Sequence, residues 1–208
     1  MPVSYWYYRN PISHPKYFKR MLVNTNPLFY VPFCHIQTND WEYKKEQLLN
    51  ILNEDNLLNI GSNGESDTIR SDFGYQANNP NKAGMHNRKL AKIFEQEIKE
   101  FRQALNIGSC KIRNSWFERG VQSEYHTIHN HGSVGYSVVC YLEYDEKVHT
   151  PTIFYCPFLN FINGDMNVTI PKEVVEGDII FFPSAIAHST QPSNSDIPRT
   201  IVSFNLDI

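Results

Sequence analysis

The half of the chain that follows Gly108 alternates short strand-forming segments with tight turns, and this pattern constrains the fold more than any other feature. The turn signals are Asn163-Gly164-Asp165, Glu176-Gly177-Asp178 and Asn194-Ser195-Asp196. Strands are predicted near residues 110–118, 134–144, 152–156, 166–170, 178–182 and 199–206. Short strands at these intervals predict an antiparallel sandwich or barrel.

The first half of the chain predicts helices that support this β-rich half. A capping residue at Asn39 or Asp40 and an apolar stripe predict a helix that runs to about Leu58. Residues 86–105 carry apolar side chains at helical spacing, and Gly108 stands where a helix stop belongs. Because the helices come first and the strands after, we predict an α+β fold with N-terminal helices packed on one face of the sheet.

Two further segments of the first half have a less regular pattern. Residues 28–36 are strand-forming, but Pro32 predicts an edge strand or a break there. Residues 61–84 are polar and rich in Gly, Asn, Ser and Asp, and a connection this long is usually functional. A solvated insertion and a substrate lid both fit it, and Arg70 and Tyr75 within it have no assigned role.

The length and charge of the chain limit what it can be. A chain of 208 residues has room for one full core, so we expect a single domain over 1–208, with support and lid at 1–108 and the core at 109–208. The net charge is -3 without a basic run, which makes nucleic acid an improbable partner. No apolar stretch could span a bilayer and no signal-peptide pattern is present, so we expect no membrane and a cytoplasmic location.

Three of the eight histidines lie within six residues, at His126, His129 and His131. On an extended segment, side chains at i and i+2 point to the same face. His129 and His131 therefore project together, while His126 joins them only if the chain bends at Ile128. Imidazoles are common ligands of first-row metals, so this pair predicts a metal site.

Two more polar residues stand at the ends of the last strands. His188 follows the apolar strand that ends at Pro183, and Arg199 opens the final strand. On that strand one face carries Arg199, Ile201, Ser203 and Asn205. An arginine among apolar residues is costly unless it is paired, and its fork suits a carboxylate. An internal salt bridge and a bound anion both satisfy that requirement.

The order of these pieces resembles the Fe(II)/2-oxoglutarate-dependent oxygenases. The shared order is His-x-His, then Gly-Asp with an apolar strand and Pro, then His, then Arg with a Ser-Phe-Asn strand, over about Ser115 to Asn205. The chain is most similar to the prolyl-hydroxylase-like branch found in phages and bacteria, which suggests such a source.

The resemblance implies both a fold and a reaction. The fold is a double-stranded β-helix, or jelly roll. The reaction uses Fe(II), 2-oxoglutarate and oxygen to hydroxylate a C–H bond, and converts 2-oxoglutarate to succinate. The primary substrate is left open by the sequence: a peptidyl residue such as proline and a small metabolite are both compatible.

The resemblance also implies roles for individual residues. His129 and His188 would be iron ligands, and Arg199 would bind the distal carboxylate of 2-oxoglutarate. Candidates for further co-substrate contacts are Ser203, Tyr136, Tyr141 and Asn114, with Trp116 beside Asn114 on the neighbouring strand.

One position departs from the pattern of these enzymes. Most of them hold iron with two histidines and one carboxylate, and the carboxylate position is occupied here by His131. We expect His131 to be the third ligand; the alternative is that a water or another acid fills the position. Glu124 and Glu143 are the nearest acids, and neither has the required spacing. Three neutral imidazoles would leave the site one charge unit more positive.

Two other classes of protein fit parts of the pattern. A cupin-type metalloprotein also offers His-x-His followed by a later histidine, but it usually has a glutamate a few residues after the pair. The corresponding stretch here is Gly132-Ser133-Val134-Gly135-Tyr136, and Arg199 would have no role. A non-catalytic jelly-roll binding module would bind neither iron nor 2-oxoglutarate.

Overall fold

The computed structural model describes residues 30–59 and 68–208. The contacts of the chain divide it into Met1–Tyr30 and Val31–Ile208, and the secondary structure of the described residues lies in the second unit. The predicted strand at 28–36 and the predicted loop at 61–84 therefore lie partly outside the described residues. No helix among the described residues is long and apolar enough to cross a membrane.

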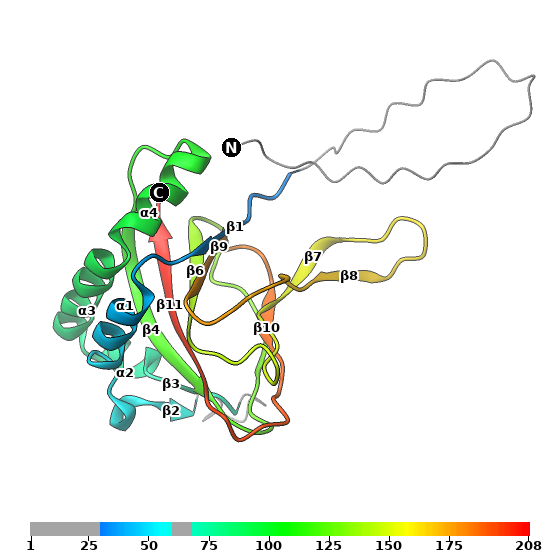
Figure 1. Ribbon diagram of the computed structural model, residues 1–208. Helices are drawn as coiled ribbons and strands as arrows, with labels where there is room; N and C mark the ends of the chain where they lie inside the picture. Colours follow the sequence, from blue (N-terminus) through cyan, green and yellow to red (C-terminus); the bar gives the residue numbers. More distant parts are fainter. Residues whose placement is uncertain (1–29, 60–67) are drawn as a thin grey trace, which may run out of the picture. The chain divides into compact units, whose positions relative to one another are not determined.

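Two antiparallel sheets form the second unit (Figure 1). The larger sheet has the order β1 (Cys34–Gln37), β9 (Asp178–Pro183), β6 (Tyr136–Glu143), β11 (Arg199–Asp207), β4 (Lys111–Gly120), β3 (Arg70–Ser71) and β2 (Leu58–Asn59). The smaller sheet has the order β5 (His126–His129), β10 (His188–Thr190), β7 (Ile153–Leu159) and β8 (Met166–Thr169). From β5 onward the chain changes sheet at every connection except the β7–β8 hairpin. This winding is the predicted double-stranded β-helix.

The helices cover one face of the larger sheet. They are α1 (Trp41–Leu49), α2 (Phe73–Asn78), α3 (Pro80–Ile93) and α4 (Glu95–Leu105). Figure 1 shows α1, α3 and α4 beside β4, β11 and β6. Leu48, Leu90 and Phe101 bury their side chains against the sheet, and Phe101 stacks on Phe181 with 4.5 Å between ring centroids. The predicted α+β arrangement, with helices on one face, is confirmed.

The helix boundaries differ from those that the sequence predicts. The helix expected over 86–105 is two helices that meet at Phe94, whose backbone leaves the helical range at φ -100° and ψ 21°. The Phe94 ring is buried against Phe204, with 5.7 Å between ring centroids. This tertiary contact outweighs the helical spacing of apolar residues, which predicted one continuous helix. The helix expected to reach Leu58 ends at Leu49, because the chain there turns into a short 3-10 helix (Glu54–Asn56) and then β2.

Part of the predicted 61–84 loop has regular structure. Residues 70–84 form β3, α2 and the start of α3, so the expectation of an irregular connection was wrong for them. The polar composition concealed these elements because α2 has no buried residue and α3 begins with proline at its first turn. The edge strand expected beside Pro32 is confirmed, because β1 is the last strand of the larger sheet and pairs with β9.

A second core fills the space between the two sheets. Val139, Tyr141, Ile180 and Ile201 from the larger sheet pack there with Phe154 from the smaller one. Successive residues along a strand point to opposite faces of the sheet. Val202 on β11, and Cys140 and Leu142 on β6, therefore belong to the core under the helices. The inner face of β11 is thus the one that carries the polar residues.

Candidate functional site

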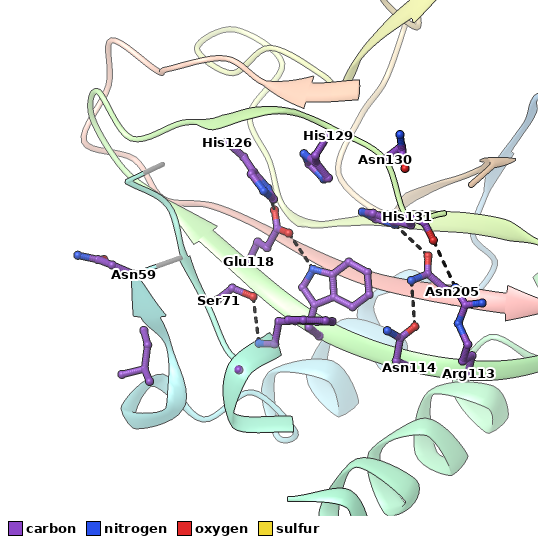
Figure 2. A pocket seen from close by; sticks show the side chains of 14 residues that line it. Asn59, Ser71, Arg113, Asn114, Glu118, His126, His129, Asn130, His131 and Asn205 are labelled. Atoms are coloured by element: carbon purple, nitrogen blue, oxygen red, sulfur yellow. Dashed lines mark hydrogen bonds and ion pairs between the residues drawn. The ribbon is translucent and has the colours of Figure 1, made fainter. Parts of the chain in front are cut away.

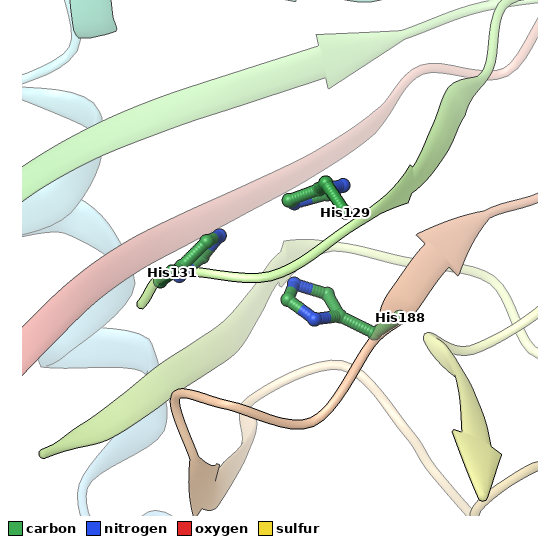
Figure 3. A group of neighbouring side chains, drawn as sticks. All are labelled: His129, His131 and His188. Atoms are coloured by element: carbon green, nitrogen blue, oxygen red, sulfur yellow. The ribbon is translucent and has the colours of Figure 1, made fainter. Parts of the chain in front are cut away.

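Three histidines converge between the sheets (Figure 3). His129 ends β5 and His188 begins β10, and the two strands pair so that these residues are direct cross-strand neighbours. His131 lies two residues beyond β5, where its backbone N–H donates to the Ser184 carbonyl at 2.9 Å. One ring nitrogen from each histidine lies within 4.8 Å of the others. The predicted His129–His131 pair and His188 are therefore brought together.

Each imidazole is oriented through its Nδ1 atom. Nδ1 of His129 lies 2.8 Å from the Thr127 carbonyl oxygen, and Nδ1 of His188 lies 3.0 Å from the Ile186 carbonyl oxygen. A carbonyl oxygen can only accept, so in both rings Nδ1 carries the proton. A metal ion would then be bound through Nε2.

His131 is oriented by side chains instead of a carbonyl. Its Nδ1 lies 2.9 Å from the Asn205 Oδ1 atom and 2.9 Å from the Ser137 hydroxyl. Ser137 in turn donates to Asn205 Oδ1 at 2.7 Å and lies 2.9 Å from the Ser184 hydroxyl. Asn205 Nδ2 donates to Asn114 Oδ1 at 2.9 Å. The predicted residue Asn114 is thus linked to the histidines through Asn205.

The surroundings favour the neutral form of two of these imidazoles. Burial, and then the charge of His129, lower the pKa of His131 to about 4. Burial, and then His129 and His131, lower the pKa of His188 to about 3. Unprotonated imidazole is the form that binds metal, so His131 and His188 are in their ligand state at neutral pH.

Arg199 is buried without a partner. Its side chain is 4% exposed, and Nε and both terminal nitrogens have no hydrogen-bond acceptor. The guanidinium carbon lies 5.5 Å from the centroid of the Tyr141 ring, which stabilises the cation only in part. The salt bridge left open by the sequence is absent from Arg199 among the described residues. A buried, unpaired guanidinium is the group that a bound carboxylate would satisfy.

The other predicted co-substrate residues fall into two groups. Ser203 is buried and shares the inner face of β11 with Arg199, as its spacing predicts. Tyr141 presents its ring to Arg199, and its hydroxyl donates to Thr152 Oγ1 at 3.1 Å. Tyr136 does not join this group: it packs against Phe101 in the core under the helices, at 4.9 Å between centroids. Tyr136 lies five residues before Tyr141 on β6, so its side chain points to the opposite face of the sheet.

A pocket of about 490 Å³ opens beside the histidines (Figure 2). Its lining includes His129 and His131, and also Leu58 and Asn59 of β2 and Phe73 at the start of α2. Its position makes it the place where a second ligand can approach the three histidines.

The pocket contains a buried carboxylate that the sequence analysis did not single out. Trp116 Nε1 donates to Glu118 Oε1 at 2.7 Å, and His126 Nδ1 lies 3.4 Å from Glu118 Oε2. Burial raises the pKa of Glu118, but the His126 charge and these hydrogen bonds outweigh it and hold the pKa below its usual range. The sequence contained a signal for Glu118. Residues two apart on a strand point to the same face, so Glu118 shares a face of β4 with Trp116, which the resemblance placed near the co-substrate. His126 stacks on His129 at 3.8 Å but is not one of the three converging residues.

The fold and the site together define a class of protein: a double-stranded β-helix with three converging histidines that could hold a metal ion, and with a buried, unpaired arginine. Residues 114–205 match a family model with the description "Putative 2OG-Fe(II) oxygenase". Over these residues the resemblance read from the sequence is confirmed, and this part of the chain is similar to the 2-oxoglutarate/Fe(II)-dependent oxygenases. A comparison with curated protein sequences gives no match.

Solved structures with the same fold belong to this class. The carbocyclase SnoK from nogalamycin biosynthesis is 10% identical with a TM-score of 0.60, covering 84% of this chain and 79% of SnoK. The epimerase SnoN, in complex with Fe3+, alpha ketoglutarate and nogalamycin RO, is 14% identical with a TM-score of 0.58, covering 84% and 78%. The viral collagen prolyl hydroxylase of Paramecium Bursaria Chlorella virus-1, in its 2OG complex, is 14% identical with a TM-score of 0.51, covering 84% and 94%. At such identities these likenesses show the shared fold.

Proposed function

We propose that this chain hydroxylates a C–H bond of its primary substrate while it converts 2-oxoglutarate to succinate. The observation that carries the proposal is the buried guanidinium of Arg199, which has no acceptor in the described chain and lies on the same strand face as Ser203 and Asn205. That strand also holds the residue that orients His131. An arginine on the inner face of β11, and a histidine cluster that this face contacts through Asn205, suit a co-substrate that is an anion at one end and a chelator at the other.

The iron ligands in this proposal are His129, His131 and His188. The fixed Nδ1 atoms aim the other nitrogen of each ring, and three ligands on one side of a metal ion leave positions for a bidentate co-substrate and oxygen. Bound Fe(II) supplies the activation of oxygen, for which no side chain is suited. The residues of the chain hold the three imidazoles in place, keep His131 and His188 neutral, and keep the site between two sheets.

Arg199 is the proposed partner of the distal carboxylate of 2-oxoglutarate. Binding would replace an unpaired buried cation by a charge-assisted, bidentate pair, so the ligand relieves a cost that the free protein carries. The Tyr141 ring backs the guanidinium, and the Ser203 hydroxyl on the same face is a candidate donor to the co-substrate. Asn114 acts indirectly, through its hydrogen bond with Asn205.

The pocket of about 490 Å³ is the proposed place for the primary substrate. Trp116 and Phe73 give it an apolar floor with ring centroids 5.3 Å apart, and Glu118 gives it a buried acceptor. A peptidyl residue such as proline and a small metabolite both fit a pocket of this size. Among the proteins of similar fold, one is a prolyl hydroxylase, one a carbocyclase and one an epimerase, so hydroxylation is our choice and does not follow from the fold.

The alternatives explain less of the site. A cupin-type metalloprotein would use the histidines but would leave the buried charge of Arg199 without a purpose. A non-catalytic jelly-roll binding module would also leave unexplained why three imidazoles are aligned through Nδ1. Neither alternative predicts that 2-oxoglutarate binds.

The experiment that tests the proposal is an anaerobic titration of the protein with Fe(II), with and without 2-oxoglutarate. The expected result is a metal-to-ligand charge-transfer band that needs both additions and saturates at one iron per chain. Exposure to air should then release succinate. A wild-type protein that binds Fe(II) but gives no such band would exclude the oxygenase assignment in favour of a cupin-type site. A protein that binds neither would be a binding module.

A further inference from the structure

The β7–β8 hairpin exposes an unusually apolar surface. Figure 1 shows it extending away from the two sheets. Phe161 and Ile162 at its tip are 93% and 97% exposed. Its strands also expose Phe158, Leu159, Met166, Val168 and Ile170. From Ile153 to Pro171 the one charged residue is Asp165. Exposed apolar residues scattered singly need no explanation, but a contiguous set on one element indicates a binding surface.

The outer strand of this hairpin is also an open sheet edge. Among the described residues β8 is the last strand of the smaller sheet, and its one pairing partner there is β7. All of its residues are exposed. Natural sheet edges are usually protected by lysine, proline or a bulge, and Met166–Thr169 contains neither lysine nor proline. The strand therefore offers backbone donors and acceptors that another strand can pair with.

We propose that β8 pairs with β8 of a second copy of this chain, antiparallel and about a twofold axis at Val168. The sequence Met166-Asn167-Val168-Thr169-Ile170 has a polarity pattern that is symmetric about its centre. Antiparallel pairing about Val168 places Met166 opposite the partner's Ile170, and Asn167 opposite the partner's Thr169. Apolar residues then meet apolar ones and polar residues meet polar ones. A shift by a single residue in the pairing would place apolar opposite polar side chains.

The same arrangement covers the tip of the hairpin. Because the strands run in opposite directions, the tip of each copy approaches the base of its partner's hairpin. A groove of about 250 Å³ lies there, with Phe33, Phe154 and Pro171 among its lining residues. Phe161 and Ile162 at the tip are the apolar groups available to fill it. Asp165 would come to lie next to the partner's Lys172, which adds an opposite charge at each end of the interface.

These observations favour a second copy over an unrelated partner. A different protein or a lipid surface would use the apolar side chains, but pairing with a second copy about Val168 also brings Asp165 beside the partner's Lys172 at each end of the interface. The dimer is independent of the proposed function, because no residue of β8 lines the pocket beside the histidines. In the smaller sheet β8 is also at the opposite edge from β5, which carries His129.

The association is tested first by sedimentation equilibrium of the full chain from about 1 to 100 μM. The expected mass is twice that of the 24.2 kDa chain at the upper end of this range. Val168→Lys places two like charges at the twofold axis and should weaken the dimer by about a hundredfold. Met85→Lys is the matched control, since Met85 is 51% exposed on α3, away from the hairpin, and should leave the dimer unchanged.

Disulfide capture tests the register even if Val168→Lys were to disturb the hairpin. In a Cys156→Ser background, Val168→Cys puts two sulfurs directly across the axis, at a separation that a disulfide spans. Mild oxidation should give a covalent dimer, whereas Met85→Cys in the same background should not. A wild-type chain that stays monomeric throughout overturns the proposal, even if its hairpin binds lipid vesicles. A dimer that persists in Val168→Lys and resists capture by Val168→Cys overturns it too.

Discussion

The side-chain oxygen of Asn205, near the end of the last strand, lies 2.9 Å from Nδ1 of His131, far earlier in the chain. This contact takes the place of the backbone carbonyls that orient His129 and His188. The third ligand of the proposed metal centre is therefore held by an amide on the same strand as Arg199. β11 therefore carries both the residue that orients His131 and the proposed partner of the co-substrate carboxylate.

Removing that amide should weaken metal binding. We expect Asn205→Ala to lower Fe(II) affinity about 10- to 100-fold, because His131 loses the acceptor that fixes its ring. Isothermal titration under anaerobic conditions measures this. Asn114→Ala, which touches Asn205 but not His131, should have a smaller effect. Equal losses in the two variants would show that Asn205 acts through general packing.

His131 itself can be compared with a neighbouring histidine. His131→Ala should abolish the charge-transfer band, because two imidazoles hold Fe(II) far more weakly than three. His126→Ala is the matched control: His126 stacks on His129 at 3.8 Å but stands outside the converging group, so the band should persist. A band that survives His131→Ala would remove His131 from the metal ligands.

Replacement of Arg199 should change stability and binding in opposite directions. Arg199→Met removes a buried charge without a partner, so the ligand-free protein should gain about 1–3 kcal/mol in free energy of unfolding. Affinity for 2-oxoglutarate should fall by about a hundredfold or more, because the carboxylate loses its partner. Denaturant unfolding and the charge-transfer titration measure the two effects. Arg102→Met, on α4 and outside the pocket beside the histidines, should leave the affinity for 2-oxoglutarate within a few-fold of wild type. A loss of stability in Arg199→Met would indicate a structural salt bridge instead.

The pH dependence of stability should contain a contribution from His86. Burial, and then the nearby Lys89 charge, lower the pKa of His86 from 6.5 to about 4. The unfolded chain takes up a proton below about pH 6.5 and the folded chain does not until about pH 4. The free energy of unfolding should therefore fall as the pH drops through this window, by about 3 kcal/mol from this residue. In metal-free protein His86→Gln should remove that part of the slope; an unchanged slope would show that His86 is protonated in the fold.

A glycine at the turn into β6 should tolerate no side chain. Gly135 has φ +84°, and a Cβ atom there would lie 2.4 Å from the Leu206 carbonyl oxygen. Gly132 has φ +107° but open space around its Cβ position. Both alanine variants bear the cost of the backbone conformation, and Gly135→Ala adds a clash with backbone. We expect Gly135→Ala to be less stable than Gly132→Ala by about 2 kcal/mol or more. Thermal unfolding of the two variants measures the difference.

Local patterns in the sequence predicted the long strands of the β-rich half and the face of each residue on β11, but not the short strands β5 and β10 that carry His129 and His188. The period of two along β11 put Arg199, Ser203 and Asn205 together, and the i, i+2 spacing paired His129 with His131. The rule also separates Tyr136 from Tyr141, which lie five residues apart on β6, but Tyr136 was a candidate through the family resemblance alone and the rule was not applied to it. Helix periodicity did not reveal the break at Phe94, where burial against Phe204 decides the backbone. The elements within 70–84 were missed because their polar surface hides their structure.

The sequence by itself therefore determined the fold class, the histidines and the arginine, because each depends on residue type and on spacing within a strand. The tertiary structure decided what surrounds them. Only the folding of β11 beside β4 and β6 brings Asn205 to His131 and leaves Arg199 buried without a partner. Contacts between strands far apart in the chain depend on register and topology, which no local pattern encodes. The unpaired charge of Arg199 is such a property, and it is the one that most directly indicates a bound anion.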